Sequence, residues 1–378
     1  MYRKTPFLFS AVTLVILLAA CAVPSATQPP AAQPPAEQPT TPPQEAAPTQ
    51  APQAELPPAQ APEKSSTLTV LCTPQEDWCQ AMTRAFEAET GIKTSYVRLS
   101  SGEALARLRA GKDNPEFSVW WGGPADTYVA AKAEGLLEPY ISPNAAAIPD
   151  SQKDPEGYWT GVYVGALGFC SNRDVLAKLG VEKPDSWDDL LDERLKGQVA
   201  MAHPASSGTA YTAVWTQVVR LGSVDAAFDY LKKLHNNILQ YTKSGAAPGQ
   251  MAARGEIAVA IIFSHDCVKF ADEGAPMLEV SFPKEGTGYE IGGVALIKGA
   301  PEPEAAKMWI DWVLTAKAQE IGATVKSYQL PTNPEAKVSE RSVKLSEVKL
   351  VDYDFIEAGK SRKAITQRFE DEITVAPK

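Results

Sequence analysis

Two sets of polar residues in this sequence have the chemistry to hold a ligand. The first is the adjacent pair His265-Asp266, with Glu290 further along the chain. Carboxylates accept hydrogen bonds and an imidazole donates or accepts one, so these side chains suit a polyhydroxylated ligand. A surface loop or capped helix start is the ordinary explanation for the pair, and a glycine-punctuated turn is the ordinary one for Glu290. Trp121 or Tyr163 could add an aromatic wall, although such residues are more often in the core.

The second set consists of short Ser- and Gly-rich segments that each begin a predicted helix. A helix N-terminus concentrates unpaired N–H groups and a partial positive charge, so it binds phosphate without lysine or arginine. Ordinary N-capping is the alternative for each serine taken singly. The predicted phosphate-binding residues are Ser100, Ser101, Gly102, Ser206, Ser207, Gly208, Thr209, Ser244 and Gly245. Together the two sets predict capture of a small phosphorylated solute rather than catalysis.

Enzymatic chemistry is poorly supported. The sequence contains no GxSxG or HExxH motif, and an adjacent His and Asp do not by themselves form a nucleophile–base pair. A metal site at His265, Asp266 and Glu290, here called the acidic cluster, would need a second nearby histidine. The other two histidines, His203 and His235, are expected on a loop and on a helix surface. We therefore predict no catalytic residue, no cofactor and no metal. A secreted phosphatase or metal-dependent hydrolase is the alternative, and a structural or adhesive lipoprotein is a third interpretation.

The N-terminal region predicts export and anchoring. Residues 1–21 combine a basic start, an apolar stretch and Leu18-Ala19-Ala20-Cys21, which is typical of a lipoprotein signal peptide with lipid attached to Cys21. Residues 22–64 are rich in Pro, Ala, Gln and Thr, a composition that cannot bury enough apolar surface to fold. We expect a disordered tether that holds the folded part at the outer face of the cell membrane.

The overall charge of the chain limits the classes of partner that it is expected to bind. The formal net charge is −10, and no basic run or basic helix face stands out. This argues against nucleic acid and against electrostatic membrane binding. An anionic ligand would then be held by local dipoles and hydrogen bonds.

The five cysteines fit an oxidising compartment. With Cys21 used for lipid, the remaining four allow three disulfide connectivities. Cys72–Cys79, which is local, and Cys170–Cys267, which would join two strands of one lobe, are favoured. A zinc site is the alternative, but the chain has no CxxC pair.

Alternating strand and helix patterns from Ser65 onward predict an α/β fold, too long for one ordinary core and therefore built as two lobes. More than one strand is expected to cross between them. Lobe 1 is predicted to comprise residues 65–165 and about 291–378, and lobe 2 about 166–290. The expected strands are 68–72, 92–99, 118–121, 162–170, 198–202, 257–263, 277–282 and 294–297, and the longer expected helices end near 91, 137, 221, 235 and 322.

Several segments resemble the ferric-binding-protein-like group of extracellular solute-binding proteins. They are Gly161-Val162-Tyr163, Cys170-Ser171-Asn172, 204–211 (PASSGTAY), 255–258 (GEIA), Gly286-Thr287-Gly288, 305–319, and Leu330-Pro331-Thr332-Asn333. The resemblance covers residues 66 to about 336. It implies the type II periplasmic-binding-protein fold, in which crossing strands form a hinge between two lobes.

The same resemblance implies a function. Members of this group bind a small solute, act as monomers and deliver it to the membrane permease of an ABC importer. His265, Asp266 and Glu290 look like the sugar-binding residues of hexose-phosphate binders, and the serine-rich helix starts would hold the phosphate. Binders of 2-aminoethylphosphonate share such helix starts and are the alternative. Ferric binders use two adjacent tyrosines, and this chain has no Tyr-Tyr pair.

Overall fold

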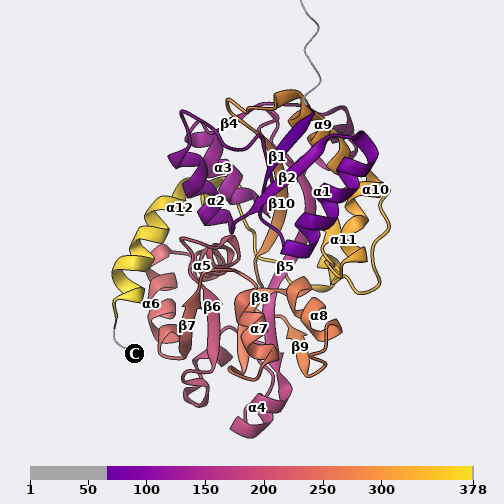
Figure 1. Ribbon diagram of the computed structural model, residues 1–378. Coiled ribbons are helices and arrows are strands. Elements are labelled where there is room, and N and C mark those ends of the chain that lie inside the picture. Colours follow the sequence, from indigo (N-terminus) through magenta and orange to yellow (C-terminus); the bar gives the residue numbers. More distant parts are fainter. Residues whose placement is uncertain (1–65, 377–378) are drawn as a thin grey trace, which may run out of the picture. The chain divides into compact units, whose positions relative to one another are not determined.

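The computed structural model describes residues 66–376, which lie within one compact unit spanning residues 60–378. The predicted signal peptide, Cys21 and the whole of the predicted tether lie outside the described residues. Strands form a central sheet, and helices pack against it (Figure 1). Within residues 66–376, no helix is long and apolar enough to cross a membrane.

The first half of the sheet is built from parallel strands, with one antiparallel strand beside them. β2, β1 and β3 pair in parallel, and β10 runs antiparallel to β3. The helices after these parallel strands begin where each strand ends, as strand–helix alternation requires. The elements are β1 (Thr67–Cys72), α1 (Glu76–Thr90), β2 (Lys93–Arg98), α2 (Ser101–Ala110), β3 (Val119–Pro124), α3 (Ala125–Ala133), β4 (Leu137–Glu138) and β10 (Tyr289–Ile297).

The second half of the sheet repeats this plan with later segments of the chain. β6 pairs in parallel with both β7 and β8. The elements are α4 (Arg173–Leu179), β6 (Val199–Ala202), α5 (Gly208–Leu221), α6 (Val224–His235), β7 (Ile238–Thr242), α7 (Ala247–Ala253), β8 (Val259–Phe263), α8 (Ser264–Asp272) and β9 (Leu278–Ser281).

One long strand connects the two halves. β5 (Thr160–Asn172) pairs with β10 and with β11 (Leu330–Pro331) through its first part, and with β8 and β9 through its last. All of its residues are buried. The chain crosses back where β9 leads into β10. The predicted crossing by more than one segment is therefore present.

Three element boundaries differ from the sequence prediction. The helix expected to reach Leu137 ends at Ala133, because Gly135 adopts φ 67° and Leu137 then pairs with β10 in β4. The helix expected through residue 322 divides into α9 (Pro303–Val313), α10 (Ala316–Gln319) and α11 (Ile321–Thr324). Thr315 causes the first break, since its hydroxyl donates to Trp312 O and accepts from Ala318 N.

The third difference affects the candidate site directly. Glu290 lies in strand β10 and not in the turn that Gly286 and Gly288 predict. β10 begins at Tyr289, five residues before the expected start, because it pairs with the middle of β5. This pairing is long-range and leaves no local signal.

The aromatic stripe of α1 lies in the core, as predicted. Trp78, Met82 and Phe86 are buried. Trp78 packs edge-on against Trp121, with ring centroids 5.1 Å apart, and Trp121 packs in turn against Trp309. Trp121 is therefore a core residue of the first half rather than a wall of a binding site.

Both favoured disulfides are present. Cys72 at the end of β1 is bonded to Cys79 in α1, and Cys170 in β5 is bonded to Cys267. Cys267 lies in helix α8 and not in a strand, so the second bond joins a strand to a helix. The sequence pattern around Cys267 wrongly suggested a strand, because the chain enters helix α8 directly after β8.

A C-terminal helix that the sequence did not predict lies along both halves. In Figure 1, α12 (Phe355–Phe369) runs past α3 and continues toward α6. Its Arg362 donates to Asp126 Oδ1 at 2.8 Å and to the carbonyl of Pro204, so it contacts both halves. Both Arg362 and Asp126 are almost completely buried. Burial raises the pKa of Asp126, while the charge of Arg362 acts in the opposite direction.

Replacing Arg362 with Met should destabilise the protein, because it leaves a buried carboxyl without its cation. The expected loss is about 3 kcal/mol in the free energy of unfolding, measured by urea denaturation. Arg368→Met is the matched control, since Arg368 lies on the same helix, also stacks on an aromatic ring, and forms more exposed ion pairs. The control should cost less than about 1 kcal/mol. Equal losses in the two variants would contradict a special role for the buried pair.

Candidate functional site

A cavity lies where the two halves of the sheet meet. Its walls come from the segments that follow β1, β2 and β3 in the first half and from the starts of α5, α7 and α8 in the second. The lining residues are Thr73, Pro74, Gln75, Arg98, Ser100, Ser101, Gly123, Pro124, Tyr163, Ser207, Gly208, Thr209, Gly245, Ala246, Phe263, His265, Asp266, Glu290 and Gln329. Ligands of open α/β sheets bind at the carboxyl ends of strands, which is where most of these residues lie.

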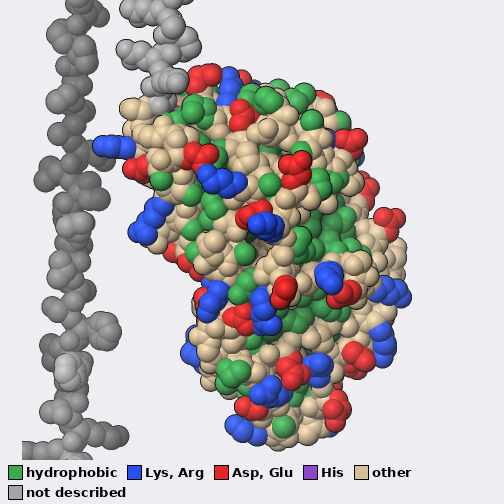
Figure 2. Space-filling model, turned by 90° about the vertical axis from the view of Figure 1, so that its right-hand side faces the viewer, with side chains coloured by type: hydrophobic (Ala, Val, Ile, Leu, Met, Phe, Trp, Pro, Cys, Tyr) green, Lys and Arg blue, Asp and Glu red, His purple; other side chains and the backbone are tan. Residues whose placement is uncertain are grey.

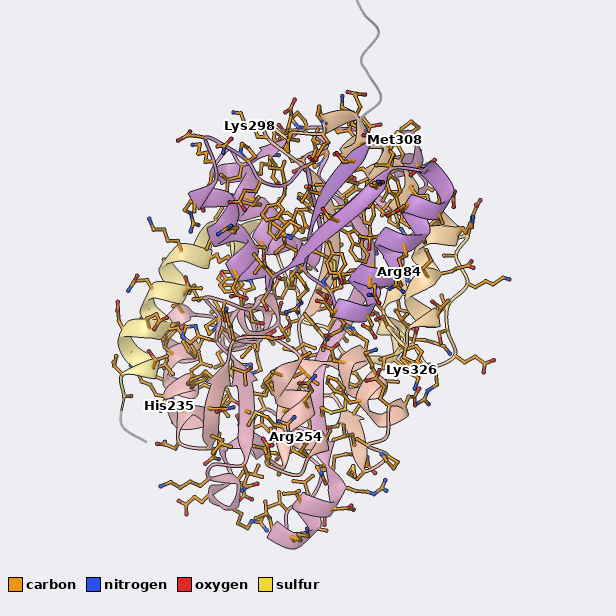
Figure 3. All side chains as sticks on the ribbon, in the orientation of Figure 1. Arg84, His235, Arg254, Lys298, Met308 and Lys326 are labelled. Carbon is orange, nitrogen blue, oxygen red and sulfur yellow. A yellow bond between two sulfur atoms is a disulfide. The ribbon has the colours of Figure 1, made fainter. Side chains whose placement is uncertain are left out.

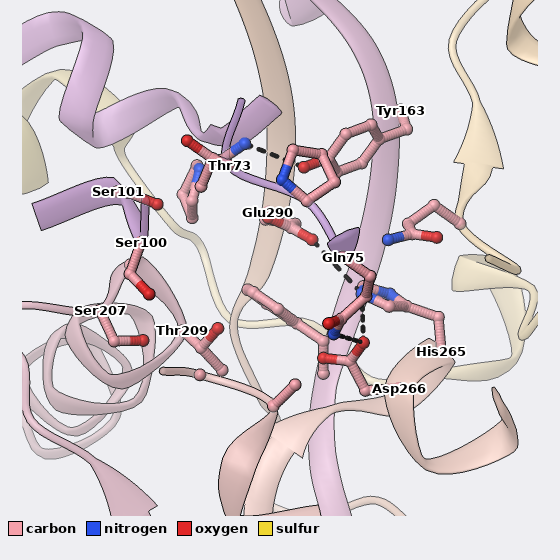
Figure 4. A pocket seen from close by; sticks show the side chains of 18 of the residues that line it. Thr73, Gln75, Ser100, Ser101, Tyr163, Ser207, Thr209, His265, Asp266 and Glu290 are labelled. Atoms are coloured by element: carbon pink, nitrogen blue, oxygen red, sulfur yellow. Dashed lines mark hydrogen bonds and ion pairs between the residues drawn. The ribbon is translucent and has the colours of Figure 1, made fainter. Parts of the chain in front are cut away.

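The serine-rich helix starts form one side of this cavity. Ser100 and Ser101 come from the start of α2, and Ser207 and Thr209 face them from the start of α5 (Figure 4). Gly245 precedes α7 and also lines the cavity. The hydroxyl of Ser100 is buried and reaches no partner with hydrogen-bond geometry among the described residues, although Glu103 completes its half of the predicted capping box. This wall therefore offers hydroxyls and helix N-termini to a ligand.

Three predicted phosphate-binding residues do not line the cavity. Gly102 N–H donates to the carbonyl of Ser206 at 3.0 Å, so both are used in a contact between the halves. The contact is close, because a Cβ on Gly102 would lie 2.0 Å from Ala205 O. The hydroxyl of Ser206 donates to Lys243 O, and the carbonyl of Ser244 accepts from Thr242. The sequence shows that these residues flank helix starts. It does not show that their polar groups already form hydrogen bonds with other parts of the protein.

The acidic cluster forms the opposite side of the cavity (Figure 4). His265 and Asp266 lie in the first turn of α8, and Glu290 projects from β10. His265 Nε2 is 3.9 Å from Asp266 Oδ1 and 3.7 Å from Glu290 Oε1. All three side chains are buried, so neither loop nor surface turn describes them. The cluster predicted from types and spacing is thus brought together in space.

A glycine in β5 makes room for this cluster. Gly165 pairs with Glu290 in the sheet, and the ring of His265 lies over it. A Cβ at Gly165 would lie 2.5 Å from His265 Nδ1. Glycine is required here because a side chain would have no space, and no local pattern singles out Gly165.

Burial controls protonation in the cluster. Burial lowers the pKa of His265, and the negative charge of Asp266 opposes part of this effect. Burial raises the pKa of Glu290 well above its usual range, and the charges of Asp266 and Asp126 raise it further. A neutral imidazole and a protonated carboxyl each offer a donor and an acceptor, which suits hydroxyl groups.

The structure adds cavity residues that the sequence did not identify. The most notable is Arg98, at the end of β2, whose guanidinium donates to Pro74 O at 3.0 Å and Thr73 O at 3.3 Å. The cavity wall therefore includes a cation besides the helix N-termini that the sequence predicts. The position of Arg98, two residues before Ser100, was the available signal. The other additions include Thr73, Gln75, Gly123, Ala246 and Gln329.

Two hydrogen bonds fix the walls. Gln75 Nε2 donates to Asp266 Oδ1 at 2.8 Å, which joins the first half of the sheet to the second across the cavity. The hydroxyl of Tyr163 accepts from Gly123 N–H at 2.9 Å. Tyr163 thus lines the cavity as predicted for an aromatic wall, and it also holds the backbone at the end of β3.

The remaining histidines lie elsewhere. His235 is buried and bonded to Tyr241, so the prediction of a helix-surface position is wrong (Figure 3). His203 lies 3.3 Å from Glu370. Among residues 66–376, no group of three or more His, Cys, Asp or Glu side chains could hold a metal ion.

The outer surface carries mixed charge. On the face drawn in Figure 2, acidic and basic side chains are interspersed. Among the described residues, exposed ion pairs include Arg107–Glu116 and Arg109–Glu134. The fold and the buried polar cavity between its halves define a two-lobed binding protein for a small solute.

Comparison with known proteins agrees with this class. Residues 81–348 match the model of the bacterial extracellular solute-binding protein family. The chain is 43% identical to the periplasmic binding protein AfuA of Actinobacillus pleuropneumoniae, solved with exogenous fructose-6-phosphate bound, with a TM-score of 0.80 over 82% of this chain and 99% of that one. It is 41% identical to a protein of Haemophilus influenzae over 82% of this chain and 91% of the relative.

A third relative is a proposed 2-aminoethylphosphonate-binding periplasmic protein of Salmonella typhimurium, 32% identical over 64% of this chain and 70% of the relative. The chain belongs to the bacterial extracellular solute-binding protein family. It has the two-lobed α/β fold of periplasmic binding proteins and is the solute-binding component of an ABC importer, working with a membrane permease and not as an enzyme.

Replacing Glu290 with Gln should change how stability depends on pH. Above about pH 4.5 the unfolded wild-type chain releases a proton that folded Glu290 retains, so wild-type stability falls as pH rises toward the raised pKa. Glutamine cannot titrate. The free energy of unfolding of the variant, relative to that of the wild type, should therefore increase with pH from about 4.5 toward the raised pKa of Glu290. Urea denaturation at several pH values between 4.5 and 8 measures the difference.

His265 provides an internal check on this experiment. Its lowered pKa makes stability rise with pH up to about 6.5, and this contribution is expected in both proteins and cancels in the difference. Parallel pH profiles for wild type and Glu290→Gln would contradict a raised pKa for Glu290.

Proposed function

We propose that this protein captures a phosphorylated sugar, of the hexose phosphate class, and presents it to its permease. The observation that carries the proposal is that one cavity has helix N-termini on one side and the buried His265, Asp266 and Glu290 cluster on the other. A hexose phosphate has two matching ends, one anionic and one rich in hydroxyls. The 43% identity to a protein solved with fructose-6-phosphate supports the same assignment.

The phosphate end would lie against α2 and α5. Ser101, Ser207 and Thr209 supply hydroxyls, and the two helix N-termini supply N–H groups and positive dipole ends. Gly208 and Gly245 let the ligand approach the backbone. Arg98 adds a positive charge at this cavity, which the acidic protein otherwise does not offer to an anion.

The hydroxyl end would lie against the acidic cluster. Asp266 accepts hydrogen bonds, and neutral His265 and protonated Glu290 both donate and accept. Burial strengthens these bonds, because water does not compete for the groups. Their closeness to one another favours a ligand with several adjacent hydroxyls.

A second ligand class fits the same cavity less fully. 2-Aminoethylphosphonate would place its phosphonate at the helix starts and its ammonium beside Asp266 and Glu290, and the Salmonella typhimurium relative supports this alternative. A protonated Glu290, however, offers less to a cation than to a hydroxyl. Ferric iron fits least, since the chain has no adjacent tyrosine pair.

We further propose that the ligand is enclosed by closure of two lobes, residues 65–165 with about 291–378, and about 166–290. The contacts between the halves support this. They include Gln75 with Asp266 and Gly102 with Ser206, and each would form only in a closed arrangement. Ligand contacts from both lobes would then shift the open–closed equilibrium toward closure. The protein is proposed to act as a monomer.

Calorimetric titration tests the ligand. Fructose 6-phosphate or glucose 6-phosphate should bind, and 2-aminoethylphosphonate and ferric citrate should bind more weakly or not at all. Asp266→Asn should weaken hexose phosphate binding about tenfold or more and leave inorganic phosphate nearly unchanged, because a hydrogen bond to a charged group contributes about 1.5–3 kcal/mol. Ser101→Ala should weaken both ligands alike.

Two variants serve as controls for this titration. Asp229→Asn changes an exposed aspartate on α6, and Ser223→Ala changes a serine that caps the same helix away from the cavity. Neither should alter affinity. Heat of binding with the phosphonate and none with either hexose phosphate would overturn the sugar assignment.

The anchor is also a proposal, since Cys21 lies outside the described residues. Cys21→Ser should release the protein from the membrane pellet into the soluble fraction, because the lipid attachment site is lost. Fractionation of expressing cells, with immunoblotting, measures this. Retention of the variant in the pellet would contradict lipidation at Cys21.

A further inference from the structure

Each disulfide adjoins a segment that lines the cavity. Cys72 and Cys79 bracket a short connection from β1 to α1, and three of its residues, Thr73, Pro74 and Gln75, line the cavity. Cys267 follows His265 and Asp266 in the first turn of α8 and is bonded to Cys170 in β5. All four cysteines are buried. The two bonds thus act on two wall segments that meet across the cavity.

The first segment holds several binding groups in place. The carbonyls of Thr73 and Pro74 accept from Arg98, and the hydroxyl of Thr73 accepts from Trp120 Nε1 at 2.9 Å. Pro74 packs so closely on Gly122 that a Cβ there would lie 2.3 Å from its ring. Movement of this segment would therefore move Arg98 as well as Gln75.

The second bond joins the two elements between which the ring of His265 lies. The ring rests over Gly165 of β5 and stacks on Phe263, with centroids 5.4 Å apart. Cys267 fixes α8 to the same strand through Cys170. Any separation of α8 from β5 would release the ring and move Asp266 with it.

Neither α1 nor α8 has a side-chain capping hydrogen bond at its N-terminus. Gln75 and Phe263 directly precede α1 and α8, and neither residue makes a side-chain capping hydrogen bond. By contrast, α5 and α6 are capped by Ser207 and Ser223. A helix start without a cap frays more readily. In α1 and α8, a disulfide within the first or second turn ties the start of the helix to a strand.

We propose that Cys72–Cys79 and Cys170–Cys267 are positioning bonds that hold the two wall segments, residues 73–75 and 265–266, in the geometry that binds the ligand. The segments meet in the Gln75–Asp266 hydrogen bond, so each bond supports one partner of that contact. Binding then depends on oxidation of both pairs. This inference rests on the proposed function for the identity of the ligand but not for the location of the segments.

The test compares two double variants, Cys72→Ala/Cys79→Ala and Cys170→Ala/Cys267→Ala, with the oxidised wild type. Hydrogen exchange, read by mass spectrometry, should rise at least about tenfold in residues 73–76 or 264–267 of the corresponding variant. Titration with fructose 6-phosphate well below the unfolding midpoint should show affinity lowered about tenfold, because binding must then order the segment. Leu234→Ala is the control, since Leu234 is a buried core residue of α6 and does not line the cavity.

The outcomes separate positioning from general stability. Local exchange and weaker binding in the double variants, without either in Leu234→Ala, support the inference. Unchanged exchange in the two segments, unchanged affinity, or the same changes in Leu234→Ala overturn it. If the wild type fails to bind fructose 6-phosphate, the proposed function fails, and the inference is judged by exchange and by titration with 2-aminoethylphosphonate.

Discussion

The pairing of β5 with partners in both halves of the sheet is the constraint on which the site depends. Because one buried strand passes from the first half to the second, the cavity must form around its middle. A side chain at Gly165 would fill the place where the ring of His265 lies. The register of β10 against β5 then sets Glu290 beside that ring. A single backbone feature thus positions residues from three separate parts of the sequence.

Charge is arranged within the cavity and not over the protein as a whole. The net charge is −10, yet the helix starts and Arg98 give part of the cavity wall a local positive character. The acidic cluster occupies the opposite wall, and its burial suppresses ionisation of Glu290. One end of the cavity thus has positive character, and the other combines the negative charge of Asp266 with the buried side chains of His265 and Glu290.

Local sequence signals predicted a large part of this arrangement. Strand–helix alternation predicted the α/β fold, and helix-start serines such as Ser101 and Ser207 do line the cavity. What the sequence could not show depends on contacts between distant segments. Glu290 belongs to a strand because of its pairing with β5, and Gly165 matters because a ring from α8 lies over it. Gln75 was missed for the same reason, because its partner Asp266 lies far along the chain, whereas Arg98 stands two residues before Ser100 and helix α12 begins at a local cap, Asp354.

The distribution of the disulfides has a mechanical consequence. Cys72 and Cys79 both belong to the first half of the sheet, and Cys170 and Cys267 both belong to the second. Neither crosslink spans the junction, so rotation of one half against the other stretches no covalent bond outside the backbone. Each disulfide therefore stiffens one half of the sheet and places no covalent constraint on the junction between the two halves.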